Sequence, residues 1–234
     1  MKDKFSMTLN ENIFLAKRNL VDSIWKSANL EGIGMTFPDT YTVCNGMSVN
    51  GYTIDEINAV NDLKKGWEYL LETINEVIDL AYIKKLHRIV GKNTVINAGS
   101  LKLEPTGVGG TDWISDVPDS NEINNQIQKI MEINSNTERA LTLMLYCMRC
   151  QMFYDGNKRL STLLANKEMI RNGAGIISIP IQKQPIFIKE LIIFYETNNY
   201  TNIMNFLYEN CINGINFSKE PEQNVEKIIA NAEK

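Results

Sequence analysis

The segment Ala140–Cys150 constrains the fold more than any other part of the sequence, because most of its residues are apolar. A helix with apolar side chains on almost every face must be buried on all sides. A second helix is predicted over 157–172, where Gly173 ends it. Between the two helices lies a short turn that reads Phe153-Tyr-Asp-Gly-Asn-Lys. The sequence therefore predicts a core of two consecutive helices joined by a polar turn.

Helical periodicity predicts further helices before and after this pair. They span 11–30, 54–73, 79–91, a segment from about 120, 186–197 and 200–212. Residues 93–119 contain several glycines, two prolines and the alternating segment Leu101-Lys-Leu-Glu, which favours a hairpin or an ordered loop. We therefore predict one all-α domain with a small β-hairpin. Its parts are an N-terminal helical segment over 1–33, a core over 34–215 and a charged tail over 216–234.

Composition and charge exclude several classes of protein. A chain of 234 residues with 44% apolar and 22% charged residues is typical of a globular protein. The net charge of -4 argues against nucleic acid as the main partner, because proteins that bind it concentrate Lys and Arg. No apolar run approaches the roughly 20 residues that cross a bilayer, and the N-terminus does not resemble a signal peptide. We expect a soluble protein of the cytoplasm without a membrane partner.

The cysteines do not form a recognisable metal site. Cys147 and Cys150 have C-x-x-C spacing, but they lie inside the apolar segment and no second pair occurs. His87 is the only histidine, so a zinc ion would lack ligands. We therefore expect buried thiols.

The turn at residues 155–159, Asp-Gly-Asn-Lys-Arg, has the properties of a phosphate site. The first four N–H groups of a helix lack partners within the helix, and the helix dipole adds positive charge there. Gly156 would let a phosphate approach the main chain, and Arg159 could contact it with two N–H groups. Asp155 could hold a magnesium ion that bridges the phosphates. The alternative is an ordinary surface turn in which Asp155 caps the helix.

The segment Gln151-Met-Phe-Tyr-Asp-Gly-Asn-Lys-Arg resembles the signature motif of the Fic (Fido) family. That motif reads His, any residue, Phe, any residue, Asp or Glu, Gly, Asn, Gly or Lys, Arg. The surroundings resemble the family too: His87 in Lys-Leu-His-Arg matches an upstream helix, and Gly110-Thr-Asp-Trp matches a hairpin called the flap. Residues 164–173 match the helix after the motif. The resemblance covers roughly residues 12–215.

The resemblance implies a helical domain that transfers AMP from ATP, with magnesium, to a hydroxyl side chain of a target protein. It implies that Asp155 binds magnesium. It also implies that Gly156, Asn157 and the backbone of Lys158 form an anion hole for the α- and β-phosphates. Arg159 would hold the β-phosphate.

The resemblance also implies how the target and the base of the nucleotide would bind. A flap over about 103–113 would pair with an extended target segment by strand addition. Tyr195 and Asn199 lie where the family often places adenine-pocket residues, and core packing explains them equally well. Phe153 would anchor the turn in the core. Trp113 is either a target contact or a packing residue. The candidate flap residues are Gly109, Gly110, Thr111 and Trp113.

The sequence departs from the family at the first residue of the motif. The family uses a histidine there as the catalytic base, and this chain has Gln151. An amide carbonyl is too weak a base to accept a proton at neutral pH. A general base contributes about 10²–10⁴-fold to a rate. Because we expect a structural role for His87, the resemblance implies an activity that is weakened or lost.

A second departure concerns a regulatory motif. Residues 27–32, Ser-Ala-Asn-Leu-Glu-Gly, resemble the inhibitory helix of the family, whose glutamate pairs with a second arginine three residues after the first. Here that position is Thr162. The glutamate is left to pair with Arg159 or Lys158, or to cap its own helix. The candidate inhibitory residues are Ser27, Glu31 and Gly32.

Two alternatives to AMP transfer stay open. The domain could be a non-catalytic nucleotide-binding module that responds to ATP or ADP. It could also transfer another phosphate-containing group, because Lys158 is shared with a phosphorylating branch of the family. That branch tends to lack the glycine found here at position 156.

Overall fold

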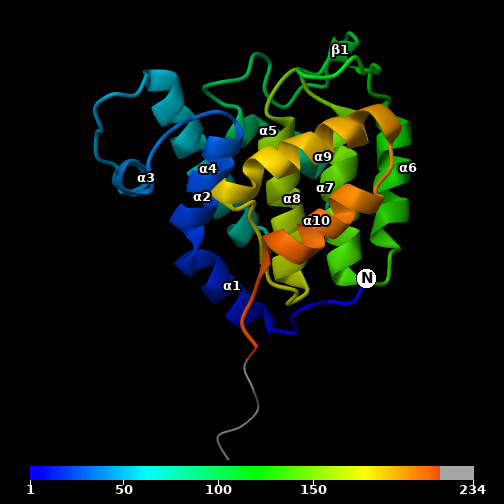
Figure 1. The fold of residues 1–234 in the computed structure, drawn as a ribbon, viewed down its shortest axis with the longest axis horizontal. Coiled ribbons are helices and arrows are strands. Elements are labelled where there is room, and N and C mark those ends of the chain that lie inside the picture. The colour runs from blue at the N-terminus through cyan, green and yellow to red at the C-terminus, as the bar shows by residue number, and fades with distance from the viewer. Residues whose placement is uncertain (217–234) are drawn as a thin grey trace, which may run out of the picture.

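The computed structural model describes residues 1–216, so the predicted tail lies outside the described residues except for its first position. Helices α7 (Asn136–Cys150) and α8 (Asn157–Arg171) lie at the centre of the fold and pack along each other (Figure 1). Both are buried over most of their length. The prediction of a central helix pair is therefore confirmed.

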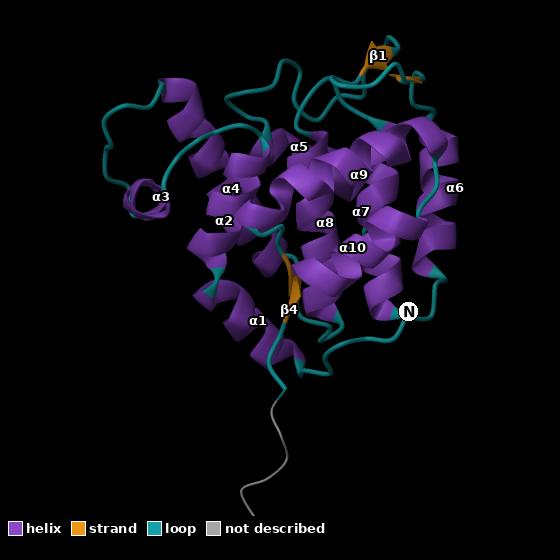
Figure 2. Cartoon of the chain, in the orientation of Figure 1, coloured by secondary structure: helices purple, strands orange, loops and turns teal. Residues whose placement is uncertain are grey.

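Five helices surround this pair at the predicted positions. Figure 2 shows that the fold is helical apart from short strands. The surrounding helices are α4 (Ile54–Glu72), α5 (Leu80–Val90), α6 (Ser120–Met131), α9 (Gln184–Thr197) and α10 (Thr201–Cys211). Close packing of α4, α5 and α8 depends on Gly66, because a Cβ atom there would lie 2.5 Å from Val90 Cγ1 and 2.9 Å from Leu163 Cδ1.

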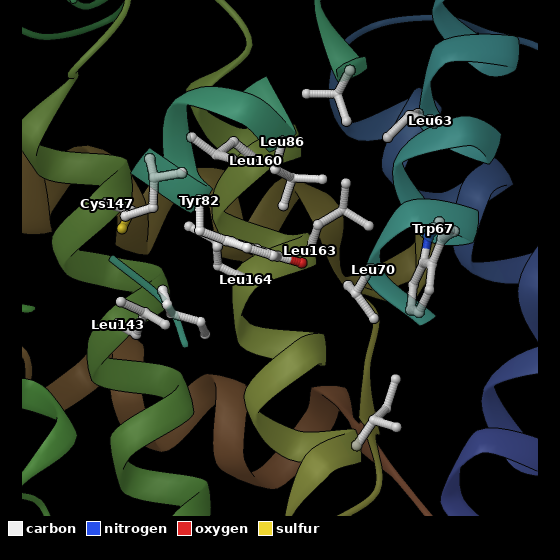
Figure 3. Packing of buried hydrophobic residues seen from close by; sticks show 14 of the residues in the cluster. Leu63, Trp67, Leu70, Tyr82, Leu86, Leu143, Cys147, Leu160, Leu163 and Leu164 are labelled. Carbon is white, nitrogen blue, oxygen red and sulfur yellow. The ribbon is translucent and has the colours of Figure 1, made fainter. Parts of the chain in front are cut away.

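The larger apolar cluster lies between α4, α5, α7 and α8. Its members point toward one another across these helices (Figure 3). They include Leu63, Trp67, Leu70, Tyr82, Leu86, Leu143, Cys147, Leu160, Leu163 and Leu164. The cluster holds the end of α7 and the start of α8 in fixed positions, and these two helix ends frame the turn between them.

The N-terminal segment differs from the prediction of one helix over 11–30. It forms two helices, α1 (Leu9–Arg18) and α2 (Leu20–Leu30), which meet at Asn19. The Asn19 side chain donates to the Leu15 carbonyl at 2.9 Å and so satisfies the end of α1, where a new helix direction begins. The buried Asn12 exchanges two hydrogen bonds with the Gly175 backbone, of 2.8 and 3.0 Å. These contacts fix α1 beside α8 and orient α2.

Three further features were not predicted. The segment predicted as mixed contains α3 (Phe37–Cys44), which begins with a Thr36 side-chain cap and proline in its first turn. A two-residue strand β3 (Ile176–Ile177) pairs antiparallel with β4 (Ile212–Asn213). A 3₁₀ turn, Ile181–Lys183, precedes α9.

The predicted hairpin is present. Strand β1 (Thr106–Gly107) pairs antiparallel with β2 (Ile114–Ser115), and Figures 1 and 2 show it above α6 and α9. The buried Lys102 holds its base, because Nζ donates to Thr106 Oγ1 at 2.8 Å and to the Ser115 carbonyl at 3.1 Å. The amide of Lys102 donates to the Met152 carbonyl at 3.0 Å. The hairpin is thus tied to the turn between α7 and α8.

Other expectations from the sequence can be checked within residues 1–216. No helix there combines the length and apolar character needed to cross a bilayer. All cysteines are free, with Cys150 half-buried and the others buried, as expected. No group of three or more Cys, His, Asp or Glu side chains suited to a metal ion occurs among the described residues.

Candidate functional site

Residues 151–156, which we call the motif turn, connect α7 to α8. Two residues with left-handed backbone bracket it: Gln151 has φ 44° and ψ 55°, and Gly156 has φ 76°. Left-handed backbone is uncommon for a residue other than glycine. These two positions redirect the chain sharply from the end of one central helix into the start of the other.

Asn157 holds the motif turn in shape. Its side chain is buried, and its Oδ1 accepts from the Phe153 amide at 3.1 Å. Its Nδ2 donates to the Phe153 carbonyl at 2.7 Å and to Gln151 Oε1 at 3.0 Å. Both Nδ2 hydrogens are therefore used inside the turn, and the backbone amide of Asn157 is the group left to face a ligand.

The start of α8 presents uncapped amides. Its N-cap residue is Gly156, and no side chain caps the helix. The first backbone hydrogen bond runs from Leu160 to the Gly156 carbonyl at 3.0 Å, and the amides of 157–159 have no acceptor among the described residues. The carboxylate of Asp155 accepts from the Gly156 amide at 2.6 Å, and its side chain is 64% exposed. The alternative in which Asp155 caps α8 is therefore wrong.

Arg159 is buried beside these amides, with 3% of its surface exposed. Its Nη1 donates to the Val90 carbonyl at 3.1 Å and to Thr94 Oγ1 at 3.0 Å. Its Nε has no partner among the described residues, and its Nη2 lies 3.7 Å from Asp155 Oδ2, beyond hydrogen-bond distance. The guanidinium is thus anchored through one nitrogen, and its buried Nε is left without a hydrogen-bond partner among the described residues.

Glu31 follows α2 and reaches the same region. Its Oε2 lies 3.6 Å from Lys158 Nζ, and its Oε1 is buried without a partner among the described residues. Burial raises the pKa of the Glu31 carboxyl, and the charge of Lys158 partly opposes this. The sequence left Arg159 and Lys158 as possible partners of Glu31, and in the structure Glu31 pairs with Lys158. Thr162 instead donates to the Lys158 carbonyl at 3.0 Å.

The other two residues of the inhibitory motif lie on either side of this contact. Ser27, one turn earlier in α2, lines a small internal cavity that Thr162 also lines. Gly32 has φ 83°, with open space where a Cβ atom would stand. The left-handed backbone at Gly32 ends the helical segment directly after Glu31.

A hollow of about 200 Å³, which we call the site cavity, opens in front of the motif turn. Gly107, Val108 and Gly109 of the hairpin, together with Ile188, Leu191 and Ile192 of α9, form part of its wall. Residues of the motif turn and α8 complete it, with Glu31 and Tyr195. The cavity therefore combines an apolar wall with the uncapped amides.

Gln151 is not free within this cavity. Its Nε2 donates to the Met148 carbonyl at 2.7 Å and lies 3.4 Å from the Tyr195 hydroxyl, while its Oε1 accepts from Asn157. Burial raises the pKa of Tyr195, so that hydroxyl stays protonated at neutral pH. Neither side chain is suited to accept a proton from a target hydroxyl.

With this geometry established, comparison with known proteins identifies the domain. A family model described as the Fic/DOC family matches residues 77–169, which contain α5, the hairpin, α7, the motif turn and most of α8. The chain contains a Fic/DOC domain.

Proteins of similar sequence are named protein adenylyltransferases. The protein adenylyltransferase Fic of Drosophila melanogaster is 27% identical over 173 residues, which cover 69% of this chain and 34% of that protein. The protein of the same name from Aedes aegypti is 28% identical over 200 residues, which cover 78% of this chain and 39% of that protein. The matched region is thus well under half of these relatives.

Solved structures share the fold. A fragment of Fic-1 from C. elegans superposes with a TM-score of 0.69 at 18% identity and covers 94% of this chain and 66% of that one. A Fic-domain signaling protein from Bacteroides thetaiotaomicron gives 0.71 at 17% identity, covering 86% and 85%. The all-α prediction with a small hairpin is confirmed.

His87 packs against the buried side of the motif turn. It is fully buried, and its ring stacks on Phe153 at 3.6 Å. Its Nδ1 accepts from the Gly99 amide and its Nε2 donates to the Asp155 carbonyl, each at 2.8 Å. Burial lowers the pKa of His87 to about 4, so it is neutral at pH 7. It thus joins two loops, which agrees with the structural role expected from the sequence.

The flap residues differ in their contacts. Gly109 lines the site cavity, and Gly110, with φ 85°, lies where a Cβ atom would be 3.3 Å from Ile192 Cδ1. Thr111 Oγ1 accepts from the Trp113 amide at 3.1 Å. Trp113 stacks on Tyr195 with ring centres 5.5 Å apart, so it packs against α9.

The two residues that the resemblance places in an adenine pocket differ in position, and two other residues near the site were not singled out from the sequence. Tyr195 lines the site cavity, but Asn199 is exposed and its Oδ1 accepts from the Thr201 amide at 2.9 Å. Thr94 holds Arg159 and Lys102 holds the base of the hairpin, and no signal in the sequence assigned either role.

Proposed function

We propose that this Fic/DOC domain binds ATP with magnesium and transfers AMP to a hydroxyl group on a protein, at a rate lowered by Gln151. The observation that carries the proposal is the row of uncapped amides at residues 157–159 beside Arg159, whose Nε has no partner among the described residues. The adenylyltransferase names of the relatives support the choice of AMP as the group transferred.

The polyphosphate would lie across the start of α8. Backbone amides and the positive end of a helix stabilise phosphate oxygens. Arg159 would add two charge-assisted hydrogen bonds through Nε and Nη2. The base would lie against the apolar wall formed by Ile188, Leu191 and Ile192.

Asp155 fits a magnesium ion that also binds phosphate oxygens. Magnesium in nucleotide sites takes one or two protein carboxylates and completes its shell with phosphates and water. Asp155 Oδ2 makes no hydrogen bond and its side chain is 64% exposed at the cavity. The ion would neutralise charge on the phosphates.

The transfer forms a bond between the target hydroxyl oxygen and the α-phosphorus. The bond from that phosphorus to the bridging oxygen breaks, pyrophosphate leaves and the hydroxyl proton must be removed. Gln151 cannot take this proton, because its amide is not basic and both ends are hydrogen-bonded. The proton would pass to water, so we expect a rate about 10²–10⁴-fold below that of a protein with a base there.

The target would bind through the hairpin. An extended segment adds to the edge of a sheet through its main chain, so this mode accepts many sequences. Gly107 and Gly109 line the site cavity on this side, where a paired segment would bring its hydroxyl to the phosphates.

Glu31 would lower activity further. Its carboxylate lies at the site cavity, paired with Lys158, where it would repel a polyphosphate. A nucleotide would have to displace it.

The test is transfer of label from α-labelled ATP in the presence of magnesium. We expect weak self-labelling of the unchanged protein and clear labelling of Gln151→His, with mass spectrometry showing an AMP adduct. Gln151→Asn is the control, because it removes the side-chain contacts without adding a base. No labelled protein with any variant would contradict the proposal.

A second candidate is a nucleotide-binding module without catalysis. The side-chain amide of Gln151 is hydrogen-bonded through both its nitrogen and its oxygen, and these bonds stabilise the motif turn. A structural role for Gln151 favours a module without catalysis. Under this reading ATP or ADP raises the melting temperature, because ligand at 100 times its dissociation constant adds about 2.7 kcal/mol. Gly156→Asp should abolish the shift. Labelling of Gln151→His but never of the unchanged protein would favour the module.

A further inference from the structure

Asp62, in the middle of α4, carries a carboxylate with no exposed surface. The neighbouring positions Ala59 and Leu63 on the same helix are buried and apolar. Asp62 forms no ion pair among the described residues. Burying a carboxylate without a cation is costly unless hydrogen bonds satisfy its oxygens. The contacts that Asp62 makes must therefore offset this cost.

Both oxygens of Asp62 contact one residue of a distant turn. Oδ2 accepts from the backbone amide of Asn93 at 2.9 Å, and Oδ1 accepts from Asn93 Nδ2 at 2.8 Å. We call this pair of hydrogen bonds the Asp62 clamp. Asn93 itself is an exposed residue, where water can satisfy a side-chain amide. The main effect of the clamp is therefore to fix the position of the turn.

The turn that the clamp holds carries both anchors of Arg159. Residues 90–94, which we call the anchor segment, comprise the last residue of α5 and the turn after it. Arg159 Nη1 donates to the Val90 carbonyl at 3.1 Å and to Thr94 Oγ1 at 3.0 Å. These two bonds are the only hydrogen bonds of the guanidinium among the described residues. Its orientation therefore depends on the anchor segment.

Helix α4 fixes the anchor segment at two points. It lies beside α5 and α8 (Figure 3). One helical turn after Asp62, Gly66 allows close approach of Val90, because a Cβ atom at Gly66 would lie 2.5 Å from Val90 Cγ1. The clamp on Asn93 fixes the other end of the segment. The two acceptors of Arg159 are thus held in place from α4.

We propose that Asp62 is a positioning residue of the phosphate site and acts on Arg159 through the anchor segment. This inference rests on the proposed function, in which Arg159 contacts a phosphate of the nucleotide. Without the clamp, the turn after α5 would shift relative to α8, and Nη1 would lose its fixed pair of acceptors. A guanidinium that is no longer held binds a phosphate less tightly, because binding must then order it.

The test measures ADP binding in the presence of magnesium by isothermal titration calorimetry on the full chain. Asp62→Asn keeps the shape of the side chain but replaces one acceptor by a donor, so one hydrogen bond of the clamp is lost. We expect this variant to bind ADP about tenfold more weakly, as for the loss of one hydrogen bond to a charged group. The Arg159 Nε–H signal in NMR spectra of the nucleotide-free variant should shift or broaden.

Exchanging the two side chains of the clamp should restore it. In Asp62→Asn/Asn93→Asp, the amide oxygen at position 62 accepts from the backbone amide of residue 93. The amide nitrogen at position 62 donates to the carboxylate at position 93. We expect this double variant to regain the ADP affinity and the Arg159 signal of the unchanged protein. Asn93→Asp alone sets two carboxylates against each other and should weaken ADP binding.

Two further variants separate positioning from a loss of stability. Asn12→Leu removes two buried hydrogen bonds to the Gly175 backbone, beyond the other end of α8. It should lower the melting temperature and leave the ADP affinity unchanged. Arg159→Met removes the side chain on which the clamp acts. Adding Asp62→Asn to Arg159→Met should therefore weaken ADP binding no further.

The outcomes distinguish this proposal from the proposed function. If Asp62→Asn binds ADP as tightly as the unchanged protein, or if its effect adds to that of Arg159→Met, the positioning proposal is wrong and nucleotide binding stands. If the unchanged protein does not bind ADP, the proposed function fails. The Arg159 signal of the nucleotide-free variants then decides whether Asp62 positions this side chain.

Discussion

Replacing Gly156 by alanine tests the geometry on which the site depends. The backbone at Gly156 has φ 76°, a left-handed conformation that costs a residue with a Cβ atom about 1–2 kcal/mol. The added Cβ would lie 3.2 Å from His87 Nε2, a tight contact, and 3.4 Å from Arg159 Nη2. In a domain of this size that destabilisation lowers the melting temperature by roughly 2–8 °C.

The assay is thermal unfolding followed by circular dichroism, with nucleotide titration of the same samples. Gly34→Ala is the matched control, because Gly34 has no positive φ and open space where the Cβ atom would stand. Gly156→Ala should also weaken ADP binding about tenfold, as expected for disturbing one hydrogen bond to a charged group. If Gly156→Ala melts with the control and binds ADP normally, the described start of α8 is incorrect.

Three further predictions concern the surroundings of the site. Because burial lowers the pKa of His87 to about 4 in the folded state, the unfolded chain takes up the proton first as pH falls below 6.5. Between pH 7 and pH 5 the protein should therefore lose about 2 kcal/mol more stability in urea titrations than His87→Gln. Thr162→Arg gives Glu31 a second cation and should lower labelling of the Gln151→His protein roughly fivefold, while Thr162→Met does not. Lys102→Met leaves hydrogen-bond acceptors of the hairpin unpaired, so the protein should lose about 1–3 kcal/mol and the hairpin amides should exchange faster, as hydrogen-exchange mass spectrometry would show.

The central helix pair and the motif turn were predictable because their signals are contiguous in the sequence. The apolar run before residue 151 and the turn before residue 157 place a helix end beside a helix start whatever surrounds them. Gly156 has the left-handed backbone that glycine adopts readily, while its role in the approach of a phosphate stays a prediction.

The break at Asn19 was missed because the apolar periodicity continues across it. Helix α3 was missed because eight residues are too few to show a clear period, although the Thr36 cap and the following proline were visible signals. The strands β3 and β4 pair over two residues each and come from distant segments. No local pattern predicts such a pairing.

The site residues show the same limit. Asp155 and Arg159 were found through the motif, but the motif does not reveal that Arg159 is anchored on Val90 and Thr94. Asp55 and Arg159 line one hollow although they come from helices far apart in the sequence. Such contacts depend on tertiary packing and become apparent in the structure.

The most direct test of the account is an amide NMR titration of the isotope-labelled protein with ADP and magnesium. We predict that the largest chemical-shift changes fall on the amides of residues 156–159, with the Arg159 Nε–H signal moving alongside them. Saturable binding that leaves these amides unchanged, or no binding at millimolar ADP, would contradict the claim that the start of α8 binds phosphates.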